Sequence, residues 1–133
     1  MSTNSFIAII NADKSVDAIY CHNDGYPSHQ VPTLVNNYNS EEKARALIAL
    51  GDLSYLGDKI APTGDSHSFS RPEDNTVVAY NRDRDEDWES VKPKHYETRN
   101  AFLDEVKGTY TYVYHTAKNR WYRAYGRTLK PLV

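Results

Sequence analysis

The sequence predicts an α+β domain in which helices pack on a mainly antiparallel sheet, with the element order β-β-α-α-β-α-β-β. The first observation is a β-hairpin pattern near each end of the chain. The second is that strand and helix patterns between the hairpins do not alternate regularly, as a parallel sheet requires. The third is the length of 133 residues, close to the commonest size of one domain. We therefore expect a single domain over residues 1–133.

The opening hairpin is predicted over residues 5–10 and 16–22, joined by a polar linker of hairpin length at residues 11–15. In the second strand the side chains alternate between two faces, so Tyr20 and His22 share one face. His22 thus ends the strand in line with Tyr20.

Two short amphipathic helices are predicted to follow this hairpin. Ser28 can cap the first, whose apolar side chains recur at helical spacing from Val31 to Tyr38. Ser40 can cap the second, which has acidic residues in its first turn and ends at Gly51.

The second half of the sequence predicts a long connection, a strand, a helix and a closing hairpin. Glycine, proline and serine residues indicate an irregular segment over 51–74, and residues 76–80 form a short β-branched strand. Pro93 can open a helix that extends to about Lys107. Alternating tyrosines at 109–115 and the returning run at 120–125 predict the last hairpin.

Composition and charge exclude several classes of protein. The formal net charge of −2 argues against a general affinity for nucleic acid, although residues 116–133 carry only basic charges and residues 83–89 are mostly acidic. The single cysteine cannot form an intramolecular disulfide, and no apolar run is long enough to span a bilayer. The N-terminus lacks a signal pattern, so we expect a cytosolic protein with no membrane partner.

The segment over residues 19–29 is the strongest candidate for a site, because many hydrogen-bonding and titratable side chains crowd around one glycine-containing turn after a strand. Arginines elsewhere can supply charge, since a guanidinium matches a phosphate group. The predicted ligand-binding residues are Tyr20, His22, Asp24, Tyr26, His29, Arg82, Arg84 and Arg123. We expect the turn to lie beside Arg82 and Arg84 in a shared concave pocket.

Other chemistry at this turn is less well supported by the pattern. Cys21 and His22 point to opposite faces of a strand, which disfavours a metal site. A lone cysteine in a strand is more often a buried apolar residue than a nucleophile. General acid-base chemistry by His22, oriented by Asp24, stays open as a small hydrolase. The common phosphate-loop, dinucleotide, metalloprotease and serine-hydrolase motifs are absent, and we expect no cofactor and no metal.

Four blocks resemble a family of small accessory proteins encoded by bacteriophages and prophages. They are STNSFIA at 2–8, IYCHNDGYP at 19–27, LIALGDLSYLG at 47–57 and VAYNRDR at 78–84. The tyrosine-rich closing hairpin resembles that of the family as well. The chain has Asn4 where the family usually has arginine, and Asn23 where it usually has tryptophan.

The resemblance implies a viral protein that acts in the host bacterial cytoplasm, in counter-defence or host takeover. Combined with the tyrosine, histidine and arginine content, it favours non-catalytic binding of a phosphorylated small molecule, such as a nucleotide-type signal, or of a host protein. The alternatives are a protein-protein inhibitor of a host enzyme and the small hydrolase that depends on His22. Exposed tyrosine-rich strands also favour a homo-oligomer.

Overall fold

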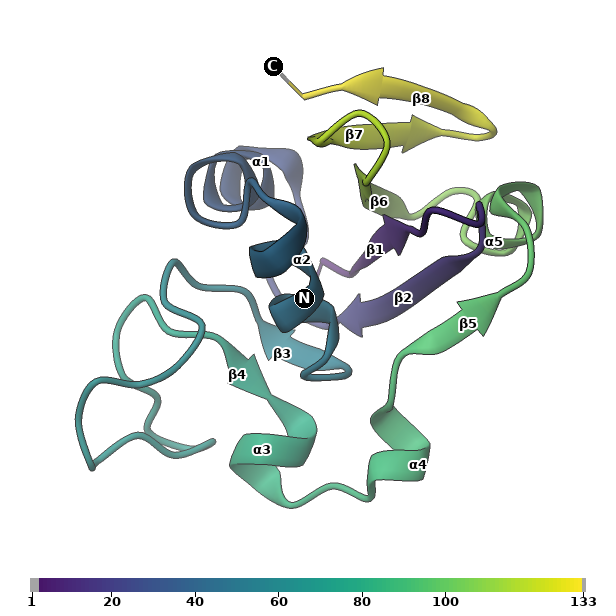
Figure 1. The fold of residues 1–133 in the computed structure, drawn as a ribbon. Helices are drawn as coiled ribbons and strands as arrows, with labels where there is room; N and C mark the ends of the chain where they lie inside the picture. The colour runs from purple at the N-terminus through teal and green to yellow at the C-terminus, as the bar shows by residue number, and fades with distance from the viewer. Residues whose placement is uncertain (1–2, 133) are drawn as a thin grey trace.

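The computed structural model describes residues 3–132, and within them it contains one eight-stranded sheet. The strands are β1 (Ser5–Ile10), β2 (Val16–Cys21), β3 (Leu53–Tyr55), β4 (Val78–Ala79), β5 (Lys94–Tyr96), β6 (Tyr110–His115), β7 (Arg120–Tyr125) and β8 (Thr128–Pro131). Their order across the sheet is β4-β3-β2-β1-β6-β7-β8, and β5 pairs with β2 outside this path (Figure 1).

Five helices accompany the sheet in the described part of the chain. They are α1 (Pro27–Asn37), α2 (Glu41–Ile48), α3 (Tyr80–Arg84), α4 (Trp88–Val91) and α5 (Arg99–Glu105). The Ser40 side chain caps α2 by accepting a hydrogen bond from the Lys43 backbone N–H at 3.2 Å, and Thr98 caps α5 in the same way.

The sheet is mixed, so the prediction of a mainly antiparallel sheet was wrong. The β1–β2 and β6–β7 hairpins are antiparallel as expected, but β1 and β6 pair in parallel over six residues, from Ser5↔Tyr110 to Ile10↔His115. A second parallel pairing joins β2 to β3 at Cys21↔Leu53. Local patterns determine the pairing within a hairpin, whereas the direction in which two distant hairpins meet depends on the chain between them. The α+β class itself fits the structure.

The predicted helix at residues 93–107 is also different in the structure. Its first part is the strand β5, which pairs with β2 through Val16↔Tyr96 and Ala18↔Lys94, and only α5 is helical. The pairing with β2 buries backbone groups that a helix would satisfy locally, so tertiary contact overrides the local preference here. The elements β3, α3, α4 and β8 were not predicted as such.

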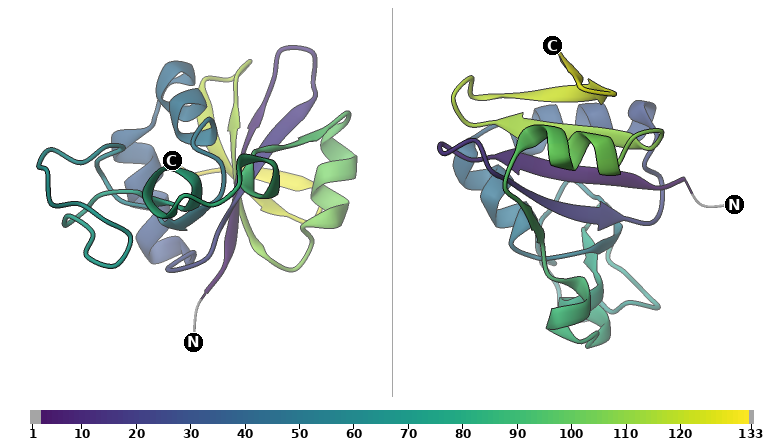
Figure 2. Two further views of the ribbon diagram at one scale, coloured as in Figure 1. Left: turned by 90° about the horizontal axis from the view of Figure 1, so that it is seen from below. Right: turned by 90° about the vertical axis from the view of Figure 1, so that its right-hand side faces the viewer.

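Helices cover the two faces of the sheet unequally. Figure 2 shows α1 and α2 on one side of the sheet and α5 on the other. Ile7, Ile9 and Ile19 face α1 and α2 in the larger apolar core, while Ala8, Ile10 and other alternate residues face α5 in the smaller one. This alternation along β1 is the period of two that a strand buried on both faces requires.

The closing hairpin contributes its aromatic side chains to the larger core. Tyr112, Tyr114 and Trp121 are almost fully buried, and the rings of Tyr114 and Trp121 meet edge to face at 5.4 Å. The Trp121 indole donates a hydrogen bond to the Tyr38 carbonyl oxygen at 3.0 Å, and the Tyr112 hydroxyl donates to the Gly25 carbonyl oxygen at 2.8 Å. These aromatic residues therefore fasten the hairpin to α1 and to the turn after β2.

No helix in the described residues has the length and apolar character needed to cross a membrane.

Candidate functional site

The side chains of the predicted turn after β2 contact different parts of the protein. Tyr20 and His22 lie together, with the Tyr20 hydroxyl 2.9 Å from His22 Nδ1. The Tyr20 ring also meets Phe6 edge to face at 5.7 Å, and burial raises the pKa of Tyr20. The partner of His22 is thus a phenol, and no hydrogen bond or ion pair of the described residues joins His22 to Asp24.

Cys21 is a buried core residue in this structure. Its side chain is fully buried, and this burial raises the pKa of the thiol to about 11. The Gln30 amide donates to Cys21 Sγ at 3.3 Å and accepts a hydrogen bond from the Ser5 hydroxyl at 2.7 Å. A thiol with a raised pKa is a poor nucleophile, which agrees with the structural interpretation of this residue.

Asp24 and Gly25 make a tight turn against the start of β1. Asp24 has a φ of 55°, and the Gly25 N–H donates to the Thr3 carbonyl oxygen at 2.8 Å. A Cβ on Gly25 would lie 2.6 Å from the Asn4 carbonyl carbon, so the glycine permits a close approach of two backbones. The turn is therefore shaped by packing against residues 3–5.

Tyr26 and His29 lie at the N-terminal end of α1, beside β3. His29 Nε2 is 2.8 Å from the Leu56 carbonyl oxygen, and its ring centroid is 5.2 Å from that of Tyr55 and 6.2 Å from that of Tyr26. This aromatic group stacks within the protein and fixes α1 against the segment after β3.

Asp52 is a residue of this region that the sequence reasoning missed. Its carboxylate accepts a hydrogen bond from the Tyr20 backbone N–H at 2.9 Å, between the part of β2 that pairs with β5 and the part that pairs with β3. Burial raises the pKa of Asp52, and the hydrogen bond from Tyr20 opposes that shift. The Asp52 carboxylate thus supplies the acceptor for a backbone N–H of β2 that lies between its pairings with β5 and β3.

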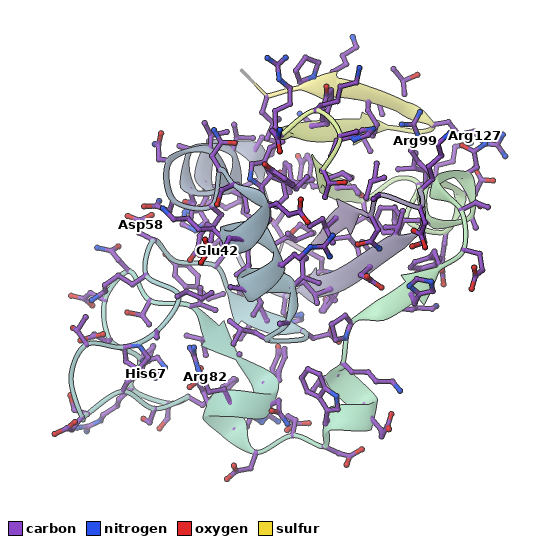
Figure 3. The ribbon with its side chains drawn as sticks, in the orientation of Figure 1. Glu42, Asp58, His67, Arg82, Arg99 and Arg127 are labelled. Carbon is purple, nitrogen blue, oxygen red and sulfur yellow. The ribbon has the colours of Figure 1, made fainter. Side chains whose placement is uncertain are left out.

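Arg82 binds to the long connection rather than to the turn after β2. Its guanidinium donates to the carbonyl oxygens of Ile60 at 2.6 Å and Val77 at 2.7 Å, and to the Asp83 carboxylate at 3.0 Å. His67 Nε2 lies 3.3 Å from the same carboxylate, and Figure 3 shows His67 and Arg82 facing each other at this connection. Arg82 therefore orders the connection, with its donors used inside the protein.

Arg84 is also partnered within the described residues. It forms an ion pair with Glu86 at 3.0 Å, and its guanidinium lies over the Phe69 ring at 4.9 Å. The Phe69 ring in turn packs on Tyr80 at 5.7 Å. Arg84 thus packs α3 against Phe69 of the long connection.

Arg123 lies apart from the other predicted residues, in a cavity of about 580 Å³ where β1 and β6 begin and β7 ends. Its guanidinium is placed between the rings of Tyr110 at 5.2 Å and Tyr125 at 4.7 Å. The cavity is lined by Thr3, Asn4, Leu103, Val106, Lys107, Gly108, Thr109, Tyr110, Thr111, Arg123, Ala124, Tyr125 and Gly126. We name it the Arg123 cavity.

The Arg123 cavity differs from the other positions in its unused hydrogen-bond donors. The Arg123 Nε atom is buried and has no hydrogen-bond partner, and its guanidinium makes no hydrogen bond or ion pair with the rest of the described chain. None of the lining residues carries a carboxylate, and Lys107 adds a second cation. The arrangement is suited to an anion that brings several acceptor oxygens.

The carboxylate of Asp104, which follows the lining residue Leu103, is already paired. Arg127 donates two hydrogen bonds to Asp104, at 2.9 and 2.7 Å, and this pairing lowers the pKa of Asp104. Figure 3 shows Arg127 at the α5 end of the molecule. The local charge around the cavity therefore stays positive.

The structure thus separates the eight predicted ligand-binding residues instead of collecting them around one contact network. Tyr20 and His22 form one pair, Tyr26 and His29 belong to another group, and Arg82 and Arg84 hold the long connection. Their roles as ligand contacts stay predictions. Sequence reasoning missed Lys107, Tyr110 and Tyr125 as residues of this cavity. The alternation of the closing hairpin marks the two tyrosines, whereas no signal in the sequence marks Lys107.

Neither a metal-ligand cluster nor a similar known protein identifies a function for the described residues. Over residues 3–132, no group of three or more histidine, cysteine, aspartate or glutamate side chains is arranged to hold a metal ion. Comparisons with protein-family models, with curated proteins and with solved structures gave no significant match.

Proposed function

We propose that this chain is a non-catalytic binding protein that captures a phosphorylated small molecule of nucleotide type in the Arg123 cavity. The observation that carries the proposal is the guanidinium of Arg123, held between two tyrosine rings with its donors unpaired in a cavity that carboxylates do not line. The resemblance of the sequence to phage accessory proteins supports a role in the infected bacterium, where capture of a nucleotide signal would blunt host defence.

The unpaired donors favour a bound anion on energetic grounds. A buried donor without a partner costs roughly 1–3 kcal/mol, and a charged one costs more. The fork of an arginine matches two oxygens of a phosphate group, and stacking on aromatic rings restricts the side chain before the ligand arrives. A phosphate at the outer nitrogens of Arg123 would therefore meet donors that the described chain leaves unpaired, with little further ordering of the side chain.

The remaining walls of the cavity suit the rest of a nucleotide. The lining includes Leu103 and Val106, which belong to the core under α5, and Ala124 from β7, and the volume of about 580 Å³ falls within the range usual for small-molecule sites. Threonine hydroxyls and backbone groups at Thr109 and Gly126 add polar contacts around the rim.

Capture without turnover follows from the composition of the same cavity. Its lining residues include no histidine, carboxylate or thiol that could act as a general base or nucleophile in the usual way. The ligand is therefore expected to be released unchanged.

Isothermal titration calorimetry with adenosine and guanosine 5′-monophosphates tests this proposal. We expect one molecule bound per chain, recovered intact after denaturation, and an affinity at least about 10-fold lower in Arg123→Gln, which corresponds to about 1.4 kcal/mol.

Arg120→Gln is the matched control, because Arg120 is an exposed arginine on the same strand and outside the Arg123 cavity. It removes the same charge and should leave the affinity unchanged. Equal loss of affinity in both variants, or no binding of either nucleotide, would contradict the proposal.

A further inference from the structure

We propose that the anion site at Arg123 extends across the sheet to Lys130 of β8, so that it accepts two linked phosphate groups, as in a nucleoside diphosphate. The inference rests on the proposed function, since it specifies which phosphorylated molecules the site prefers. It is carried by the register of β7 and β8 and by the contacts of Arg123 and Lys130 with one tyrosine ring.

The strand register places Arg123 and Lys130 next to each other on one face of the sheet. The two residues are directly opposite in the antiparallel β7–β8 pair, and opposite residues of such a pair project from the same face. Tyr112 is opposite Arg123 in β6, so this is the face that carries Tyr112 and Trp121. The edge strand β8 (Figure 1) therefore adds a second cation beside Arg123.

The Tyr125 ring contacts both charged groups. The guanidinium carbon of Arg123 lies 4.7 Å from the centroid of this ring, and Lys130 Nζ lies 5.4 Å from the same centroid. Cation–π attraction holds each charge near the ring. Tyr125 is 47 % exposed, so a ligand from solution can reach the ring and the two cations around it.

No acidic side chain offsets these two charges. Residues 116–133 contain no aspartate or glutamate, and neither Arg123 nor Lys130 forms an ion pair with another residue of the described chain. Like charges directly opposite each other on neighbouring strands destabilise a sheet. An anion shared by the two residues would remove this repulsion, which favours a ligand that reaches both.

Two linked phosphate groups complement this arrangement better than one. The guanidinium fork takes two oxygens of a single phosphate group. The ammonium group of Lys130 is a compact charge on a flexible stem, and it can reach a second phosphate group linked to the first. A nucleoside diphosphate therefore uses both cations, whereas a monophosphate held in the fork leaves Lys130 to solvent.

The test compares adenosine 5′-diphosphate with adenosine 5′-monophosphate by isothermal titration calorimetry on the full chain, without divalent cations. We expect the diphosphate to bind at least about 10-fold more tightly. In Lys130→Gln this preference should fall to about 3-fold or less, because the diphosphate weakens while the affinity for the monophosphate stays within about 2-fold.

Lys118→Gln is the matched control, because Lys118 is an exposed lysine in the turn between β6 and β7 and does not line the Arg123 cavity. It removes the same charge and should keep the full preference, and thermal denaturation should confirm that both variants fold. Equal affinities for the two nucleotides in the unmodified chain, or an equal loss of preference in both variants, would overturn the inference and leave the proposed function standing. Absence of binding by both nucleotides would overturn the two together.

Discussion

The turn after β2 and the Arg123 cavity carry similar kinds of side chain but use them differently. At the turn, Tyr20 and His22 bond to each other and His29 reaches a backbone oxygen. In the cavity, the Arg123 guanidinium lies between two rings and has no hydrogen-bond partner in the described chain. The polar groups of the turn are hydrogen-bonded within the protein, whereas the guanidinium in the cavity is available to a ligand.

Crowding of polar residues along a sequence therefore does not by itself mark a binding site. Buried polar groups are nearly always hydrogen-bonded, so the informative residue is the one whose donors remain unused. The two regions are also connected, because Gly25 donates to the Thr3 carbonyl oxygen at the cavity and accepts from the Tyr112 hydroxyl. Substitutions on either side of this connection therefore separate structural roles from binding roles.

Gly25→Ala should have the largest effect on stability, because Gly25 makes the hydrogen bonds that join the turn to Thr3 and Tyr112. A Cβ would lie 2.6 Å from the Asn4 carbonyl carbon and 2.7 Å from Ser5 Cβ, so backbone must shift. We expect a loss of about 3 kcal/mol in the free energy of unfolding, measured by urea denaturation. Gly64→Ala is the control, since its nearest neighbour is a glutamate carboxylate at 3.5 Å, and a similar loss there would remove the steric explanation.

Asp52→Ala should cost about 2 kcal/mol of unfolding free energy, because it leaves the Tyr20 backbone N–H without its acceptor. Asp52→Asn keeps a carbonyl acceptor and removes a charge whose burial raises the pKa, so it should be at least as stable as the unmodified chain at neutral pH.

The pH dependence of this pair has a definite sign. Because the folded-state pKa of Asp52 is raised, the ionised group costs stability above that pKa, and the cost is relieved as pH falls through it towards the unfolded value. Any advantage of Asp52→Asn should therefore shrink in acid. An advantage that grows in acid would show that the carboxylate is stabilised by its hydrogen bond more than it is destabilised by burial.

Tyr112→Phe should cost about 1.5 kcal/mol of unfolding free energy, since the Gly25 carbonyl oxygen loses its buried donor. Tyr110→Phe removes a hydroxyl from the neighbouring tyrosine on the same strand face, which is partly exposed, and should be close to neutral in chemical denaturation. Equal costs would mean that the hydroxyl of Tyr112 does not hold the turn.

Asn4→Arg should strengthen ligand binding, because it adds a cation to the rim of the Arg123 cavity. Asn4 is exposed and lines the cavity, so the substitution needs no repacking. We expect adenosine 5′-monophosphate to bind about 3-fold more tightly, with an increased dependence on salt concentration. Unchanged affinity at low salt would argue against an anion at this end of the cavity.

His22→Ala should have the smallest effect on binding, because His22 is paired with Tyr20 and does not line the Arg123 cavity. The affinity for adenosine 5′-monophosphate should stay within about 2-fold of the unmodified value. A 10-fold loss with normal thermal stability would return the ligand site to the turn after β2.

Several elements could be predicted from the sequence because their signals are local. The alternation in β6 and β7, the β1–β2 hairpin and the Ser40 cap of α2 each depend on residues close together in the chain. The same reasoning identified Arg123 as a candidate, through the alternation of tyrosine and arginine in the last hairpin. Its cavity partners could not be found in this way, because Lys107 and Thr3 reach it from distant segments.

By itself, then, the sequence determined the α+β class, the two terminal hairpins and the short helices between them, since propensity, capping and periodicity act within a few residues. Only the tertiary structure decided that β1 and β6 pair in parallel, that residues 94–96 form a strand, and that Arg82 binds the long connection. It also decided which polar groups are left unpaired. The physical reason is that hydrogen-bond pairing and burial depend on neighbours brought together by the fold, which no local pattern specifies.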